Sequence, residues 1–143
     1  MLQSTYIPGT RQFMAPEIWK GAYNAQEADL FACGVILFFM RTGKYPFFDA
    51  TNKNSLYNKI IRGDMDAFWS AHEKKYPEGY FSEEFKHLLN FMFRPEPTMR
   101  LNLAEVYCHE WMVSEPLPKE GAIRAHFNEV MNINEDQVIT ATP

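Results

Sequence analysis

The sequence predicts a mainly α-helical fold with no convincing sheet. Apolar residues recur at helical spacing in several stretches, and in one of them they stand at i, i+3, i+4, i+7 and i+8: Phe85, Leu88, Leu89, Met92 and Phe93. Asn, Ser or Pro precedes most of these stretches and Gly or Pro follows them, as expected for helix starts and stops. The hydrophobic fraction of 46% fits a globular chain.

Length and charge narrow the class of protein. The chain has 143 residues, about one domain, and a net charge of −4, which argues against phosphate-driven nucleic-acid binding. No basic cluster suggests an anionic membrane surface. The longest apolar run, 30–40, is shorter than the about 20 residues that span a bilayer, and residues 1–10 do not resemble a signal peptide. We therefore expect an intracellular protein, cytoplasmic or nuclear, without membrane or nucleic-acid partners.

The first half of the chain predicts a loop followed by helices. Residues 1–14 are irregular, and Pro16 then opens a short helix that ends near Gly21. The segment 27–42 predicts a central helix that is buried all round, because it is apolar on nearly every face, and Gly43 suits its C-terminal end. Its β-branched and aromatic residues also fit a buried strand, but the length favours a helix.

The second half of the chain continues the pattern. Asn54 or Ser55 caps a helix that ends at Gly63, while 64–80 is ambiguous. Ser82 opens the next helix, which stops at 94–97. Asn102 caps a further helix whose inner face is expected to hold four residues: Leu103, Val106, Tyr107 and Trp111.

The C-terminal part divides from the rest. We expect one domain over 1–114 and a tail over 115–143 with a flexible end. The tail carries one amphipathic stripe that could dock back on the domain, enter a partner's groove or pack in a core: Ile123, Phe127, Val130 and Met131. The two cysteines, Cys33 and Cys108, have no metal-ligand spacing, so we expect reduced, buried thiols and no metal site.

A series of short motifs gives a more specific indication. The stretch GTRQFMAPE, residues 9–17, resembles the end of a protein-kinase activation segment. Residues 28–37, ADLFACGVIL, resemble the central D-x-W-S-x-G-V-x-L helix of kinases, and TGKYPF at 42–47 resembles the turn after it. EPTMR at 96–100 resembles D-P-x-x-R, and HEWM at 109–112 resembles the closing H-P-W helix.

The order and spacing of these motifs resemble the eukaryotic protein kinase family over about residues 4–112. The implied fold is the C-terminal helical lobe of the protein kinase-like fold, with the N-terminal β lobe absent. The balance of motifs leans toward Ser/Thr kinases of the calcium/calmodulin-dependent and AMP-activated groups.

The resemblance implies roles for residues of the first motif. Thr10 would contact the catalytic loop. Arg11, Gln12, Phe13 and Met14 would line the pocket for the substrate residue that follows the phosphoacceptor.

Other matched positions are implied to be structural. Glu17 would pair with Arg100 in a buried salt bridge, although without the resemblance they could be a helix-start carboxylate and a solvated charge. Asp29 would accept hydrogen bonds from the catalytic loop, or simply favour the positive end of its helix, and Gly34 belongs to the central-helix motif.

Some positions depart from the family pattern. Phe13 stands where tyrosine is usual, and Phe31 where tryptophan is usual. Phe39 occupies a position where many basophilic kinases have a glutamate that binds a substrate arginine, so such a preference is in doubt. Thr5 and Tyr6 are candidate phosphorylation sites, because activating phosphorylation in this family often falls about three residues before the glycine that corresponds to Gly9. A plain hydroxyl-rich loop is the alternative.

The parts that carry phosphoryl transfer are missing from the sequence. It contains no G-x-G, no H-R-D and no D-F-G, the elements that cover the phosphates and supply the base and Mg²⁺ ligand. We therefore expect no cofactor for this chain alone, and ATP with Mg²⁺ for a full-length kinase.

Three functions remain open at this stage. The chain could be the C-terminal half of a Ser/Thr kinase. A mis-assigned first methionine or a longer gene product would then explain its start, and its partners would be a protein substrate and an N-lobe. It could be a non-catalytic binding or scaffold module, using 11–14 and 43–63 as its binding face. It could also be a remnant without a defined role.

Overall fold

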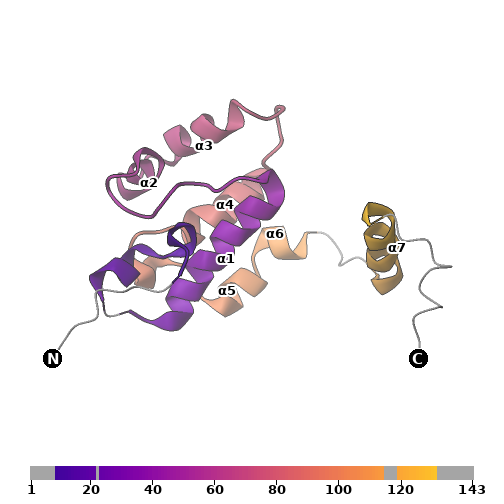
Figure 1. The fold of residues 1–143 in the computed structure, drawn as a ribbon, viewed down its shortest axis with the longest axis horizontal. Coiled ribbons are helices and arrows are strands. Elements are labelled where there is room, and N and C mark those ends of the chain that lie inside the picture. The colour runs from indigo at the N-terminus through magenta and orange to yellow at the C-terminus, as the bar shows by residue number, and fades with distance from the viewer. Residues whose placement is uncertain (1–8, 22, 115–118, 132–143) are drawn as a thin grey trace. The chain divides into compact units, whose positions relative to one another are not determined.

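The computed structural model describes residues 9–21, 23–114 and 119–131, and within these ranges it contains helices and no strand. The prediction of a mainly helical fold is thus confirmed. The chain forms two compact units, Met1–Val113 and Ser114–Pro143 (Figure 1). In the described part, no helix is long and apolar enough to cross a membrane.

Helix α1, Ala25–Thr42, is the longest element of the first unit and runs through its middle (Figure 1). The Asn24 side chain accepts a hydrogen bond from the Gln26 amide at the start of α1, and Gly43 ends it in the left-handed conformation, φ 68°. Phe31, Val35 and Phe38 form its buried face.

The expectation that α1 is buried all round is wrong. Ile36, Phe39 and Met40 are 46%, 40% and 77% exposed. The neighbouring elements cover only one stripe of the helix, so the opposite apolar stripe has no cover among the described residues.

Helix α4, Glu83–Met92, packs against α1. The Ser82 hydroxyl accepts a hydrogen bond from the Phe85 amide at the start of α4, as the sequence predicts. Gly34 of α1 lies close to the end of α4, because a Cβ added there would lie 3.0 Å from Met92 Cβ and 3.1 Å from Phe93 Cε1.

Helices α2, Ser55–Ile61, and α3, Met65–Glu73, form a packed pair. The sequence left 64–80 undecided, and the structure assigns most of its first half to α3, capped by Asp64. Phe68 and Trp69 of α3 are buried, and the Trp69 indole N–H donates to Asn90 Oδ1 at 2.7 Å.

An aromatic core fills the space between these helices. Phe31, Phe47, Tyr57 and Phe93 have ring centroids 4.9 to 6.0 Å apart where they are in contact. The Tyr57 hydroxyl donates to the Phe93 carbonyl at 3.2 Å, and burial raises the pKa of this phenol. Each buried aromatic ring removes a large apolar area from water, which stabilises the core.

The last helices of the first unit are short. A 3-10 turn, η3 (Pro97–Met99), leads to α5, Leu103–Tyr107, and α6, Glu110–Val113. Asn102 and Glu105 form a capping box at the start of α5. The predicted inner face is only half right, because Val106 and Trp111 pack against the core whereas Leu103 and Tyr107 are 73% and 74% exposed.

The prediction of buried cysteines is also wrong. Cys33 and Cys108 are both exposed and free. Cys33 stands on the uncovered side of α1, and Cys108 follows the last turn of α5. The second unit contributes α7, Glu120–Val130, on which the predicted apolar stripe is exposed.

Candidate functional site

The GTRQFMAPE segment begins as an exposed turn and ends inside the first unit. Gly9 has φ 126°, a conformation that favours glycine. Arg11–Phe13 forms a 3-10 turn, η1, in which the Phe13 amide donates to the Thr10 carbonyl at 3.0 Å. Thr10 and Arg11 are exposed and Gln12 is half-buried, whereas Met14 and Ala15 are buried. The segment therefore presents its first residues to solvent and is held by its last ones.

Aromatic contacts hold η1 against α1. Phe13 meets Tyr45 edge-on at 5.5 Å between centroids, and Tyr45 lies 5.0 Å from Phe39 near the end of α1. The Arg11 guanidinium lies 5.2 Å from the centre of the Trp19 ring. These contacts hold Arg11 and Phe13, two of the residues that the family resemblance assigns to the substrate pocket. Tyr45 comes from the 43–63 range of the alternative binding face, whereas Trp19 had no predicted role.

The second half of the segment carries a buried ion pair. Pro16–Lys20 forms a 3-10 helix, η2, with Glu17 in its first turn. The Glu17 carboxylate accepts hydrogen bonds from Arg100 at 2.6 Å (Nη1 to Oε1) and 2.7 Å (Nη2 to Oε2). The two side chains are only 7% and 1% exposed. The structure thus brings together the two residues that the family resemblance paired, in a bidentate geometry.

Arg100 also binds two backbone carbonyls. Its Nε donates to the Arg94 carbonyl at 2.8 Å, and Nη1 donates to the Glu27 carbonyl at 3.0 Å. The guanidinium lies 5.0 Å from the centre of the Phe31 ring. A buried charge is tolerated only when it is paired and hydrogen-bonded, and Arg100 meets both conditions. It connects η2, the start of α1 and the end of α4.

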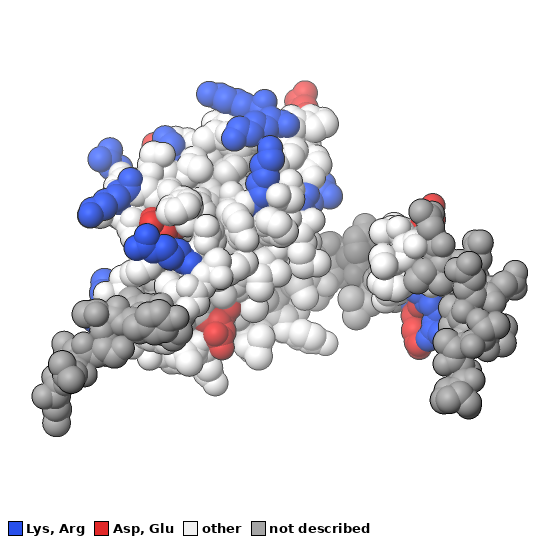
Figure 2. All heavy atoms as spheres, in the orientation of Figure 1, with Lys and Arg blue, Asp and Glu red and all other residues white. Residues whose placement is uncertain are grey.

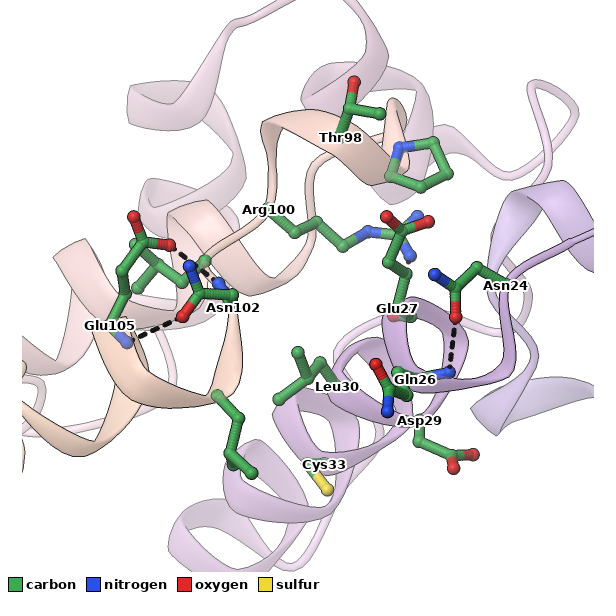
Figure 3. Close-up of a pocket in the computed structure, with 13 residues that line it drawn as sticks. Asn24, Gln26, Glu27, Asp29, Leu30, Cys33, Thr98, Arg100, Asn102 and Glu105 are labelled. Carbon is green, nitrogen blue, oxygen red and sulfur yellow. Dashed lines mark hydrogen bonds between the residues drawn. The ribbon is translucent and has the colours of Figure 1, made fainter.

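A groove of about 610 Å³ lies between the start of α1 and the η3–α5 segment (Figure 3). Its lining includes Arg100 and three carboxylates: Glu27, Asp29 and Glu105. Asp29 is exposed, and Figure 3 shows its carboxylate directed away from Arg100. Thr10 is exposed as well, and among the described residues it shares no hydrogen bond with Asp29.

The described residues offer no metal centre: they contain no group of three or more His, Cys, Asp or Glu side chains placed to hold an ion. Gly34 lies at the α1–α4 contact and not at the groove or the η1 surface. The candidate phosphorylation sites Thr5 and Tyr6 lie outside the described residues.

Comparison with known proteins settles the family. The protein kinase domain family matches residues 3–112. The chain belongs to the protein kinase family. It is 33% identical to CBL-interacting protein kinase 20 of Oryza sativa subsp. japonica over 131 residues, which are 90% of this chain and 24% of that protein.

Two further relatives agree. Serine/threonine-protein kinase SRK2F of Arabidopsis thaliana is 34% identical over 76% of this chain and 30% of its own length. The crystal structure of the Rad53 kinase domain and SCD2 aligns with a TM-score of 0.52 and 25% identity, over 78% of this chain and 40% of that one. This chain spans about 20% to 30% of the first three curated relatives' length. The predicted kinase family and helical kinase-lobe fold are confirmed.

Proposed function

We propose that this chain is the substrate-side part of a Ser/Thr protein kinase whose longer form transfers the γ-phosphoryl group of ATP to protein Ser or Thr. The observation that carries the proposal is the buried Glu17–Arg100 pair. This pair attaches the segment beside the expected substrate pocket to the helices of the first unit. A fixed position of that segment matters because it orients a protein substrate.

The residues of the η1 turn have distinct proposed roles. Arg11, Gln12, Phe13 and Met14 would contact the substrate residue after the phosphoacceptor, and Phe13 is held for this by Tyr45. Thr10 would orient the catalytic loop of the longer protein. Its hydroxyl is suited to this role because the residue is exposed and its backbone is fixed by the bond from Phe13.

The residues present do not form a site for Mg·ATP. The sequence has no H-R-D or D-F-G, and the described residues contain no group of three or more His, Cys, Asp or Glu side chains that could hold a metal ion. No step of phosphoryl transfer is therefore assigned to this chain. We propose that the chain alone neither binds ATP nor phosphorylates protein, and that ATP and Mg²⁺ belong to the longer form.

One experiment tests the kinase proposal. The genomic region upstream of Met1 is sequenced, and the longest in-frame product is expressed beside the 143-residue chain. The longer product is expected to contain H-R-D and D-F-G and to phosphorylate a Ser/Thr peptide library, with Thr10→Ala losing more activity than Thr10→Ser. An in-frame stop close upstream, or phosphorylation by the short chain with Mg·ATP, would contradict the proposal.

A non-catalytic binding module is the second candidate function. The observation that favours it is that the η1 surface is already ordered by Phe13, Tyr45 and Phe39 within this chain. Such a module would bind a protein segment on this surface. Binding of peptides by the 143-residue chain, measured by calorimetry and lost in Phe13→Ala, combined with an upstream stop codon, would support this alternative.

A further inference from the structure

Two histidines meet where α6 joins α4. His87 belongs to α4, and His109 directly precedes α6. His87 Nδ1 and His109 Nε2 are 2.8 Å apart, with ring centroids at 5.1 Å and planes tilted by 27°. This distance is that of a hydrogen bond, so one of the two nitrogens carries a proton and the other accepts it.

A second hydrogen bond identifies the donor. The backbone N–H of Trp111 donates to His109 Nδ1 at 3.2 Å. Nδ1 of His109 must therefore be an acceptor, and the proton of the neutral ring lies on Nε2. His109 Nε2–H then donates to Nδ1 of His87, which carries its own proton on Nε2. Both rings are neutral in this arrangement.

His109 also lies at the start of α6, where its carbonyl and side chain both accept backbone hydrogen bonds. The amides of Met112 and Val113 donate to the His109 carbonyl at 2.8 and 3.2 Å. His109 is therefore the residue that caps α6, and its side chain satisfies the Trp111 amide. Trp111 packs on Phe85 of α4 with ring centroids 5.6 Å apart. The histidine pair and this aromatic contact are two attachments of α6 to α4.

An additional proton cannot enter the pair without breaking a hydrogen bond. On His109 Nδ1 it would face the Trp111 N–H, donor against donor. On His87 Nδ1 it would face the His109 Nε2–H in the same way. Either position converts an acceptor into a donor, so the two bonds exist together only when both rings are neutral.

We infer that His87 and His109 form a proton-sensitive latch at the start of α6. At neutral pH the His87–His109 bond and the Trp111 amide bond are both made, and a proton on either ring leaves only one of them; on His109 Nδ1 it keeps the bond to His87 and releases the Trp111 amide. α6 is the last helix of the first unit, so the latch controls how well the first turn of that helix is capped.

The surroundings of the pair are mixed in charge. His87 borders one groove with Asp66, Glu73, Glu83 and Lys86, and another with Arg94 and Glu96. Lys86 is paired with both Glu73 and Glu83. Partial burial and the neighbouring His87 lower the pKa of His109, and Glu110 opposes this. The lowered pKa of His109 agrees with a neutral histidine pair at pH 7.

Nitrogen NMR of the full chain tests the latch directly. At pH 7.5 the imidazole ¹⁵N signals are expected to show His109 protonated on Nε2 and unprotonated on Nδ1. Between pH 7.5 and pH 5.5, hydrogen-exchange protection of the Trp111 amide, corrected for intrinsic exchange, should fall about fivefold as its bond is lost. A proton on His109 Nδ1 at pH 7.5, or constant protection, would overturn the inference.

Variants separate the pair from other titrating groups. His109→Asn keeps a side-chain acceptor for Trp111 without a titrating ring, so protection in H109N should no longer depend on pH. The matched control His126→Gln removes an exposed histidine from α7 and should leave the dependence unchanged. An undiminished dependence in H109N would overturn the inference. So would Zn²⁺ shifting both rings at pH 7.5, since the pair would then be a metal site.

Discussion

Two kinds of titratable group are buried inside the first unit: an ion pair and a neutral histidine. Glu17 and Arg100 are buried as ions and satisfy each other. His72 is buried with no ion pair among the described residues; its Nε2 lies 3.0 Å from the Pro46 carbonyl, and its ring centroid lies 4.8 Å from those of Phe38 and Phe68. The first arrangement depends on keeping both partners, and the second depends on keeping the ring neutral.

Removing one partner of the ion pair should be costly. Glu17→Gln keeps the shape of the side chain but leaves the Arg100 charge without compensation, so the free energy of unfolding should fall by about 3–5 kcal/mol. Urea unfolding measures this change. Glu120→Gln is the matched control, since it removes the carboxylate of an exposed pair with Arg124 and should cause no measurable change. Equal effects in the two variants would contradict a special role for the buried pair.

His72 should make stability depend on pH. Burial lowers its pKa to about 4 from 6.5, so the unfolded chain takes up the proton first. The stabilisation is complete above pH 6.5 and is lost as the pH falls toward 4. Between pH 7 and pH 5 the loss should be about 2 kcal/mol.

Urea unfolding at several pH values measures this dependence. His72→Gln should flatten it, because the glutamine amide can still donate to the Pro46 carbonyl but does not titrate. His126→Gln, which changes an exposed histidine, should keep the wild-type slope. An unchanged slope in H72Q would show that other groups cause the dependence.

Single residues show where sequence reasoning succeeds. Glu17 and Arg100 could be paired beforehand only because their motifs match a family, since nothing local relates residues 83 positions apart. The hydrogen bond from Arg100 to the Glu27 carbonyl and the His87–His109 contact were not predicted. Such contacts depend on how helices pack, which the spacing of apolar residues does not specify.

At the scale of the elements, helix starts are predicted better than helix faces. Ser82 and Asn102 cap their helices as expected, and of the two candidates Asn54 and Ser55 it is Asn54 that caps α2. Such caps are local chemistry between a side chain and the next few amides. The exposed side of α1 and the exposed Leu103 and Tyr107 were predicted as buried. Apolar residues indicate that a helix face would be stabilised by burial, but they do not show whether other elements of the described chain bury it.

The contact between α1 and α4 should be sensitive to one methyl group. Gly34→Ala places a Cβ 3.0 Å from Met92 Cβ and 3.1 Å from the Phe93 ring. The strain of overpacking exceeds the gain in helix propensity, so unfolding should become easier by about 1–2 kcal/mol. Gly121→Ala on α7 is the matched control, because nothing lies within 4 Å of its Cβ. It should raise helix content and leave unfolding of the first unit unchanged; stabilisation by G34A would contradict the tight contact.

At the scale of the whole molecule, much apolar surface stays outside. Large exposed residues include Met40 on α1 and Tyr107 on α5, and Figure 2 shows uncharged atoms over much of the first unit's visible face. Exposed apolar patches favour association with other surfaces. In the longer kinase form proposed above, further parts of the protein would cover these faces, since this chain aligns with only 40% of the Rad53 structure.

The isolated chain should therefore be of low stability. We expect thermal unfolding below about 60 °C and binding of a hydrophobic dye in the native state, because uncovered apolar faces contribute nothing to folding. Calorimetry and dye fluorescence measure both properties. Met40→Gln, at a residue that is 77% exposed, should weaken dye binding with little effect on the melting temperature. A cooperative transition above about 60 °C without dye binding would contradict this expectation.

The position of Arg100 in the chain has a consequence for the order of folding events. Its partners Glu17 and Glu27 lie 83 and 73 residues earlier, so the contacts close long loops. Loop closure costs entropy that is recovered only when the intervening helices are in place. These bonds should thus form after the rate-limiting step, and Glu17→Gln should accelerate unfolding while hardly slowing refolding. Stopped-flow measurements distinguish the two rates, and a large fall in the refolding rate would place the pair in the folding nucleus instead.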